Sequence, residues 1–522
     1  MNTQPIAIEG SSEAAAQAIF RMCASIHNDI RAMRRMSKQA TFADLSWLLF
    51  ALHMVRIREA HAEFSLPDLI SSDFASFALL EEGLKYAIQS ATKYGKLTRN
   101  LRDPVGHLAQ RIPSLGHFVQ TANLMHAKYT NIALLQLCHA HVSRDSQGRV
   151  SIDLHAARSD PQIASLYDYF RRLEVHTVVD KQPIPAKLLV ETFVASLSGL
   201  EDIFEAAFHV SPSLFGSVVT HLLDTVIDAF KSRADSLPRV TDDRVDTSDP
   251  LTSIIWGQSL LIPMSAITAR FGGSATSALQ EFLFIKTAFD PENLDYHQVF
   301  RTPILPYDAS LVIVSPELLL DSLNSNVHYT LLERHPKVAE QYKARASRRF
   351  VDQISQTCLA NGYEEVTREL QLVHGSTQLG DVDLVTRNAN GRFLLIETKN
   401  HSLPLSVYFR DPAATERHLA YLKDNWERPF LRRLSHLTQR AADYAIPPDF
   451  SYIIVSRMPE VLSHFSSHIA VSEQELPQLI PLIGKAQSFA ELHHQLYPAG
   501  DPLSDEEVGR LFRDGLSIIR PA

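Results

Sequence analysis

The sequence predicts a multidomain protein of mixed α and α/β structure, in which a large, mostly helical N-terminal region precedes a smaller α/β domain. Three observations predict this class. The chain has 522 residues, which is too long for one hydrophobic core and typical of two to four domains. Apolar residues recur with a helical period through most of residues 1–230. Residues 331–460 combine helical patterns with short β-rich runs that are typical of a sheet.

The composition is that of an ordinary globular protein, with 45% hydrophobic and 21% charged residues. The three cysteines, Cys23, Cys138 and Cys358, are far apart, so they predict neither a disulfide framework nor a zinc motif. The N-terminus lacks a basic segment followed by an apolar one, and the longest apolar run, residues 47–55, is too short to span a bilayer. We therefore expect a cytoplasmic protein.

The N-terminal region, residues 1–230, is expected to be a helical domain. Its first ten residues are expected to be frayed, and Ser11-Ser12-Glu13 is typical of a helix start. The sequence VSRDSQGRVSIDL, which starts at residue 142, alternates around a Gln-Gly pair and predicts a small β-hairpin near residues 142–155. One apolar stripe at helical spacing comprises Val219, Leu222, Leu223, Val226, Ile227 and Phe230.

The segments that flank the α/β domain are less regular. Residues 231–253 are polar, contain two prolines and are expected to be a linker. Residues 254–330 predict a mixed α/β connecting segment, with one strand at 310–314, that packs directly on the following domain. Residues 461–522 are expected to form short C-terminal helices, one of which starts near Ser504.

Residues 331–460 predict the element order αβββαβ. The expected elements are a helix at 337–360, a strand at 366–374, two hairpin strands on either side of residues 388–391, a helical stretch at 415–444 and a strand at 451–456.

The hairpin is the segment GDVDLVTRNANGRFLLIETKN, residues 380–400. A turn centred on Asn390 would place Asp383 directly opposite Glu397, with their side chains about 5 Å apart on one face of the sheet. A tighter turn on the Asn-Gly pair alone would shift the register by one residue and turn the two carboxylates to opposite faces. We expect the first register, because it gathers the reactive groups on one side.

Glu397 and Lys399 are two residues apart on a strand, so their side chains point the same way. Two carboxylates at this separation repel each other unless a divalent cation lies between them, and Mg²⁺ typically takes one or two carboxylate ligands. A lysine beside them can hold an attacking water and offset charge that develops on a phosphorus atom. The pattern therefore favours metal-dependent cleavage of a phosphodiester.

An acidic residue on one strand, followed by Glu-x-Lys on the next, resembles the PD-(D/E)xK nuclease superfamily, which has the restriction-endonuclease-like fold. The chain contains a single Glu-x-Lys, Glu397-Thr398-Lys399, and the order αβββαβ is that of the superfamily core. The sequence GDVD is similar to that of Holliday-junction-resolvase-like and Mrr-like members, in which the second acid is the ligand. The resemblance implies that Asp383, Glu397 and the backbone carbonyl of Thr398 bind Mg²⁺ or Mn²⁺, and that Lys399 is catalytic.

The resemblance also suggests supporting residues. Asp352, or alternatively Glu340, is the candidate for an acid on the first helix, Gln439 for a glutamine on the second, and Asp381 for a further acid on the strand. Val382 departs from the pattern, since many members have proline at this position.

The charge distribution is uneven along the chain. The net charge is −9, yet residues 331–460 have 18 Lys and Arg against 16 Asp and Glu, so this segment carries +2 and the remainder −11. Basic residues that could follow a phosphate backbone are Lys343, Arg345, Arg348 and Arg349, and then Arg428, Arg432, Arg433 and Arg440. The alternative is that they are solvated helix faces.

Other motifs are weak. The sequence Cys138-His139-Ala140-His141 and the pair His464 and His468 lack a third ligand nearby. The chain has no phosphate-binding loop, because Gly484-Lys485 is followed by alanine, and it has no zinc-protease or serine-hydrolase motif. We therefore do not expect it to hydrolyse ATP itself.

Together these patterns predict a Mg²⁺- or Mn²⁺-dependent endonuclease, with DNA as the expected substrate. The helical N-terminal region would recognise a partner, a signal or the substrate, and the domain layout suggests restriction or anti-phage defence by analogy. A requirement for a regulatory or ATPase subunit in trans is left open. The alternatives are an RNase with the same site and a catalytically inactive scaffold that binds nucleic acid or protein.

Overall fold

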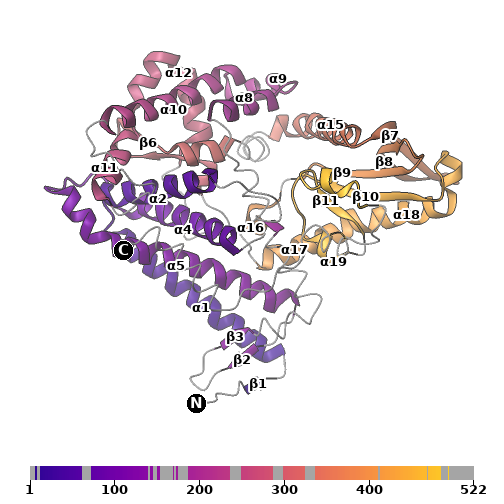
Figure 1. Cartoon of the computed structure of the whole chain (residues 1–522), viewed down its shortest axis with the longest axis horizontal. Coiled ribbons are helices and arrows are strands. Elements are labelled where there is room, and N and C mark those ends of the chain that lie inside the picture. Colours follow the sequence, from indigo (N-terminus) through magenta and orange to yellow (C-terminus); the bar gives the residue numbers. More distant parts are fainter. Residues whose placement is uncertain are drawn as a thin grey trace.

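A body of packed helices forms the first part of the chain, seen on the left of Figure 1 in the computed structural model. A five-stranded sheet follows it, which confirms the expected mixture of α and α/β parts. The helices of the body are α1 (Ser12–Ser37), α2 (Phe42–His61), α4 (Ser72–Tyr94), α5 (Pro104–Cys138), α8 (Ala186–Ser196), α9 (Glu201–Phe208), α10 (Pro212–Ala234), α11 (Pro250–Ser259), α12 (Met264–Leu283) and α13 (Gln298–Arg301). The structure describes residues 6–8, 12–61, 72–138, 142–144, 150–152, 169, 172–173, 186–234, 249–285, 298–323, 336–401, 403–408, 412–466, 468–483 and 492.

The stripe predicted on α10 is the face that this helix buries. Val219, Leu222 and Val226 are at most 1% exposed, whereas Ile227 is 38% exposed and lies at the edge of the stripe. Among the described helices, α10 is the one long and apolar enough in composition to cross a membrane. Its apolar face packs in the core of the body instead, together with residues from α2 and α4.

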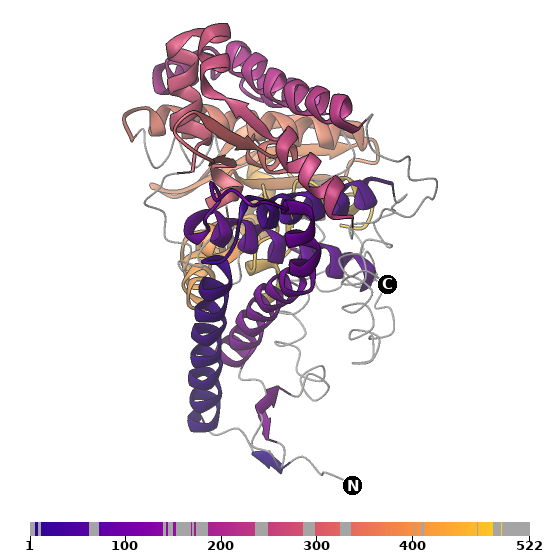
Figure 2. The same cartoon turned by 90° about the vertical axis from the view of Figure 1, so that its left-hand side faces the viewer.

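α1 and α5 lie side by side and extend away from the body, as both views show (Figures 1 and 2). A three-stranded antiparallel sheet lies at their tip and comprises β1 (Ile6–Ile8), β2 (Val142–Arg144) and β3 (Val150–Ile152). β2 and β3 pair with Val142 opposite Ile152, so the hairpin predicted near residues 142–155 is confirmed. The prediction that the first ten residues are frayed is wrong for residues 6–8, because they pair with β2.

The linker predicted at residues 231–253 is shorter than expected. α10 continues to Ala234, and α11 begins at Pro250 after Asp249, whose side chain accepts hydrogen bonds from the N–H groups of Leu251 (3.1 Å) and Thr252 (3.2 Å). The pair Asp249-Pro250 is the sequence signal for the start of α11, although the predicted linker contains both residues. Residues 235–248 lie outside the described part of the chain.

The segment predicted as mixed α/β contains a second three-stranded sheet, in the order β4-β6-β5. Its strands are β4 (Leu261–Pro263), β5 (Ile304–Pro306) and β6 (Leu311–Val314), of which only β6 was predicted. This segment packs on the following domain, as expected, since Leu323 lies in one core with Tyr342, but it also packs on the helical body. Its buried residues, such as Ile262 and Ile313, belong to the same core as Trp47 in α2.

The C-terminal sheet has the strand order β11-β10-β9-β8-β7. Strands β7 to β9 form an antiparallel meander, β10 runs parallel to β9, and β11 runs parallel to β10. The strands are β7 (Tyr363–His374), β8 (Thr377–Asn388), β9 (Phe393–Lys399), β10 (Phe450–Ser456) and β11 (Ala470–Ser472).

Helices cover both faces of this sheet (Figure 1). Side chains alternate along β9, so Ile396 packs with α15 on one face while Leu395 packs with α18 on the other. The helices are α15 (Pro336–Ala360), α16 (Leu405–Tyr408), α17 (Pro412–Leu422), a π-helical turn η1 (Lys423–Glu427), α18 (Arg428–Arg440), a 3₁₀ turn η2 (Ala441–Tyr444), α19 (Leu462–Phe465) and α20 (Leu476–Leu479).

From α15 to β10 the elements occur in the predicted order α, β, β, β, helix, β. The prediction that residues 461–522 are only helical is wrong for β11, which extends the sheet beyond β10. β11 has three residues, which is too short for its alternation to be detected in the sequence. The helix expected near Ser504 lies outside the described residues.

A buried ion pair connects Arg172 to Glu475 in the loop after β11, and Glu475 also accepts hydrogen bonds from the N–H and hydroxyl of Ser472 (both 2.8 Å). Burial alone would raise the pKa of Glu475, but these partners outweigh it and hold the pKa at about 2. The stability that depends on the ionised carboxylate is therefore present above the ordinary value of 4.5 and is lost as the pH falls towards 2.

Replacing Glu475 with glutamine is expected to lower the free energy of unfolding at pH 7 by on the order of 3 kcal/mol. The difference between parent and variant should shrink between pH 4.5 and pH 2, because the parent carboxylate becomes neutral there. Thermal unfolding of both proteins across this range measures it. A difference that stays constant with pH would contradict the electrostatic origin of the effect.

Candidate active site

The pairing of β8 with β9 decides which residues meet on the hairpin. The ladder runs from Arg387 opposite Phe393 to Leu384 opposite Ile396. In this register Asp383 aligns with Glu397 one position further along the two strands. The expected register is therefore confirmed, and the alternative, shifted by one residue, is wrong.

The turn that sets this register is held by one asparagine and one glycine. The side chain of Asn388 accepts hydrogen bonds from the N–H groups of Asn390 (3.1 Å) and Arg392 (2.9 Å). Gly391 has φ +80°, a conformation that glycine adopts without strain. The N–H of Asn388 donates to the carbonyl of Arg392 at 3.0 Å, so the turn comprises residues 389–391 and is one residue longer than the tight Asn-Gly turn, which explains the register.

Asp383 is tied to the strand that carries the other acid. Its Oδ2 atom accepts hydrogen bonds from the N–H (2.6 Å) and the hydroxyl (2.9 Å) of Thr398, and its Oδ1 atom accepts none among the described residues. Burial, and then the negative charge of Glu397, raise the pKa of Asp383 above its ordinary value. The two carboxylates therefore repel each other, which is the condition that a bound cation relieves.

Glu397 is 5% exposed, and both of its oxygens have donors. Its Oε1 atom lies 2.6 Å from the Lys399 ammonium and 2.6 Å from the Arg433 guanidinium, and its Oε2 atom accepts a hydrogen bond of 3.0 Å from the Tyr452 hydroxyl. Lys399 therefore lies on the same face as Glu397, as strand alternation predicts. The three residues predicted as catalytic, Asp383, Glu397 and Lys399, come together at the end of β9.

Arg433 and Tyr452 complete the site and were not predicted as site residues. Arg433 donates to the Tyr452 hydroxyl at 3.1 Å as well as to Glu397. Burial alone would lower the pKa of Arg433, but Glu397 and Tyr452 raise it, so the guanidinium stays charged. Burial, and then Glu397, raise the pKa of Tyr452, so its hydroxyl remains a donor. Arg433 belongs to a predicted basic cluster, but no spacing in the sequence distinguishes it from the other arginines.

Gly380 leaves room for Arg433. Its φ is +105°, and a Cβ atom at this position would lie 3.0 Å from the Nη1 atom of Arg433. Gly380→Ala is expected to lower the free energy of unfolding by about 1–3 kcal/mol through backbone strain, with an additional cost from this contact. The matched control is Gly391→Ala, which also has a positive φ but would meet no atom within 4 Å. Equal losses in urea unfolding would show that the contact contributes nothing.

The supporting candidates lie elsewhere. Asp352 on α15 pairs with Arg368 on β7, and Glu340 is 82% exposed and pairs with Lys343 at 2.9 Å. Gln439 is exposed on α18.

Asp381 is partly buried and lies opposite Gln371 on β7. No hydrogen bond or ion pair between described residues connects Glu397 to any of the four supporting candidates, which are Asp352, Glu340, Gln439 and Asp381. The α18 residue that reaches the carboxylate is Arg433, six residues before Gln439.

The donor set fits a hard divalent cation. Asp383 and Glu397 offer carboxylate oxygens on one face of the sheet, and the Oδ1 atom of Asp383 has no competing hydrogen bond among the described residues. Glu397 would exchange one of its present donors for the cation. The backbone carbonyl of Thr398 as a third ligand stays a prediction.

Much of the predicted basic surface has protein partners. Arg345 pairs with Asp202 at 2.6 Å, and Arg349 donates to the carbonyl of Ser198 at 2.7 Å, so both fasten α15 to the helical body. The arginines between residues 428 and 440 also have protein partners. Arg428 pairs with Asp424, Arg440 pairs with Asp443, and Arg432 donates to the carbonyl of Leu379. These contacts favour a structural role for the clusters.

In the part of the chain that the structure describes, the one group of possible metal ligands does not include His464 or His468. The ring of His464 packs against Tyr169, and that of His468 packs against Phe430. His139 and His141 lie outside the described residues.

Comparison of the chain with protein-family models, curated proteins and solved structures finds no match.

Proposed function

We propose that the chain is a metal-dependent endonuclease of the PD-(D/E)xK type, with a restriction-endonuclease-like domain that includes α15, the sheet and α18. The observation that carries the proposal is the register that sets Asp383 opposite Glu397, with Lys399 at 2.6 Å from Glu397 on the same face. The element order and the parallel pairing of β10 with β9 also support it.

Each residue has a definite role in this proposal. Asp383, Glu397 and the carbonyl of Thr398 hold Mg²⁺ or Mn²⁺, which when bound supplies Lewis acidity and charge neutralisation at the phosphodiester. Lys399 orients the attacking water and offsets negative charge on the phosphorus oxygens. Arg433 and Tyr452 act as positioning residues, because they hold the carboxylate of Glu397 from the α18 side of the sheet.

DNA is the proposed substrate, and RNA is the alternative with the same chemistry. The helical body is proposed to recognise a partner, a signal or the substrate, in a setting such as restriction or anti-phage defence in the cytoplasm, with a regulatory or ATPase subunit as a candidate partner in trans. What supports a recognition role is the size of the body, together with the extension formed by α1 and α5 (Figure 2).

Parallel digests test this function. The purified chain is incubated with supercoiled circular DNA, linear DNA and single-stranded RNA in Mg²⁺, in Mn²⁺ and in EDTA. Nicking of the circular DNA in either metal, and none in EDTA, is the expected result. Cleavage of RNA alone would replace DNA as the substrate, and cleavage of neither polymer in either metal would contradict the proposal.

One observation favours a second candidate, a catalytically inactive scaffold. Both oxygens of Glu397 already have protein donors, and two of these donors are cations. These contacts balance the negative charge of the buried Glu397 carboxylate without a metal. Metal binding by Asp383 distinguishes the two candidates.

A further inference from the structure

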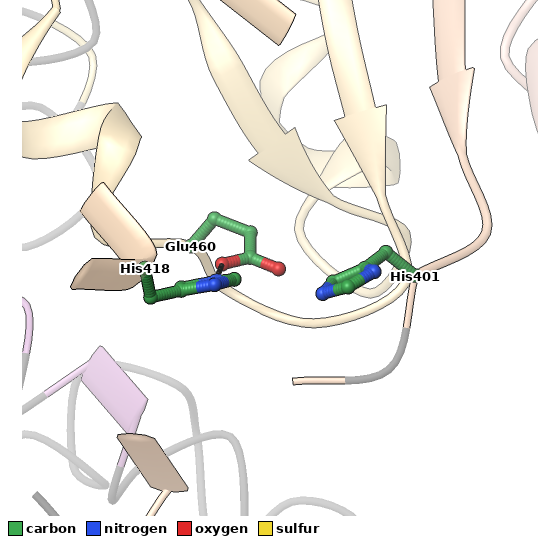
Figure 3. A group of neighbouring side chains, drawn as sticks. All are labelled: His401, His418 and Glu460. Carbon is green, nitrogen blue, oxygen red and sulfur yellow. Dashed lines mark hydrogen bonds and ion pairs between the residues drawn. The ribbon is translucent and has the colours of Figure 1, made fainter. Parts of the chain in front are cut away.

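A second group of possible ligands lies beyond the end of β9. It comprises His401, two residues after β9, His418 on α17, and Glu460 in the loop after β10. One potential ligand atom from each residue lies within 4.8 Å of the other two. Figure 3 shows the carboxylate of Glu460 between the two imidazole rings. His401 and His418 are 17 positions apart in the sequence, and His418 and Glu460 are 42 apart, so no spacing motif indicates the group.

The hydrogen bonds within this group leave two buried atoms without partners. The Nε2 atom of His418 lies 2.7 Å from the Oε2 atom of Glu460. The Oε1 atom of Glu460 and the Nε2 atom of His401 are also buried, and neither has a hydrogen-bond partner among the described residues. Glu460 is only 1% exposed, so a half-paired carboxylate at this position is costly unless another group compensates it.

Two aromatic rings lie beside the group. The ring of Tyr421 stacks near both histidines, with centroids 6.2 Å from His401 and 6.3 Å from His418. The π-helical turn η1 places the ring centroid of Trp426 5.7 Å from that of His401, with the two ring planes at 88°. Tyr421 is 47% exposed, so these rings cover the group only in part. Aromatic neighbours lower the local polarity, which strengthens the interaction between a cation and its ligands.

We propose that His401, His418 and Glu460 form a binding site for a transition metal of the Zn²⁺ class, separate from the site at Asp383 and Glu397. Two imidazole nitrogens and one carboxylate oxygen are a ligand set that Zn²⁺ uses with water in the fourth position, whereas Mg²⁺ prefers oxygen ligands alone. Small side-chain movements bring the donors to the separation of roughly 3.3 Å that a tetrahedral ion requires. The ion would bind the unpaired atoms of Glu460 and His401, and it would replace the hydrogen bond between Glu460 and His418.

The site would fasten three elements together near the catalytic lysine. The N–H of His401 donates to the carbonyl of Lys399 at 2.8 Å, so an ion on His401 would restrain the end of β9. His418 connects this point to α17, and Glu460 connects it to the loop after β10. Binding of the ion does not depend on the proposed nuclease activity.

The test measures metal binding by the full chain. The protein is stripped with a chelator, dialysed against Zn²⁺ or Co²⁺ in excess Mg²⁺, and analysed for bound metal, for the visible spectrum of Co²⁺ and for the thermal midpoint. The variants are His401→Gln and His418→Gln, in which the amide nitrogen can replace the ring nitrogen as a hydrogen-bond donor. His117→Gln, on the exposed side of α5, is the matched control. Asp383→Asn removes a ligand of the other site.

We expect one more equivalent of Zn²⁺ in the parent, the His117→Gln control and Asp383→Asn than in either site variant, with affinity at least about 100-fold lower in the variants. Zn²⁺ should raise the thermal midpoint of the first three proteins only. Equal binding by the parent and His401→Gln, or no Zn²⁺ bound by the parent, would overturn the proposal. His401→Gln decides the question if His418→Gln fails to fold, because the Nε2 atom of His401 makes no hydrogen bond to a described residue.

Discussion

Lys399→Ala is expected to lower the rate of Mg²⁺-dependent DNA cleavage by about 10²- to 10³-fold, the usual effect of removing one charge-stabilising group from an active site. The ammonium group of Lys399 is the one that lies on the open side of Glu397, since its side chain is 23% exposed while that of Arg433 is 8% exposed. It is therefore the cation that a phosphodiester and an attacking water can reach.

The substitution should leave the fold intact. Glu397 keeps its ion pair with Arg433 and its hydrogen bond from Tyr452, so no buried charge is left unpaired. We expect the free energy of unfolding to fall by about 1 kcal/mol or less. Lys343→Ala is the matched control, because Lys343 is 53% exposed and Glu340 is its one ion-pair partner among the described residues. If Lys399→Ala cuts DNA as fast as Lys343→Ala in Mg²⁺, Lys399 has no catalytic role.

The hairpin could be predicted from the sequence because its information is local. The turn residues, the alternation along β8 and β9, and the spacing from Asn390 to Asp383 and Glu397 together define the register. The helices α10 and α15 could be predicted for the same reason, since each has a long apolar stripe.

The remainder of the site depends on contacts between distant residues. Arg433 is 36 residues after Glu397, and its approach requires the α18 helix, the glycine at position 380 and the hydroxyl of Tyr452. None of these requirements leaves a periodic signal. Short strands such as β4 were missed because three residues are too few to show alternation. The packing of the connecting segment on the helical body was not predicted, because apolar residues do not specify which core they join.

Asp383→Asn is expected to abolish binding of Mn²⁺ at the proposed catalytic site and to reduce cleavage to the level seen in EDTA. Asparagine can keep the two hydrogen bonds from Thr398, because its amide oxygen replaces Oδ2, but it lacks the negative charge that a hard cation requires. Calorimetric titration with Mn²⁺ measures the loss, and Asp352→Asn, on the exposed side of α15, is the matched control.

The same variant should be at least as stable as the parent when no metal is present. The pKa of Asp383 is raised by burial and by Glu397, so the stabilising contribution of its protonated form is complete below the ordinary value of 3.8 and is lost as the pH rises through the raised pKa. In EDTA at pH 7 the neutral asparagine avoids this loss, and its thermal midpoint should exceed that of the parent. The advantage should disappear as the pH falls below 3.8.

Mn²⁺ should reverse this order, because it stabilises only the protein that binds it. The reversal distinguishes the nuclease from the scaffold. In a scaffold the ion pairs of Glu397 with Lys399 and Arg433 are permanent, so Mn²⁺ would leave the thermal midpoints of the parent and of Asp383→Asn unchanged. Calorimetry would then show no Mn²⁺ binding by the parent that is lost in Asp383→Asn. In a nuclease Glu397 exchanges one of these donors for the cation. The ionised carboxylate of Asp383 destabilises the metal-free fold, but its negative charge is what binds the metal.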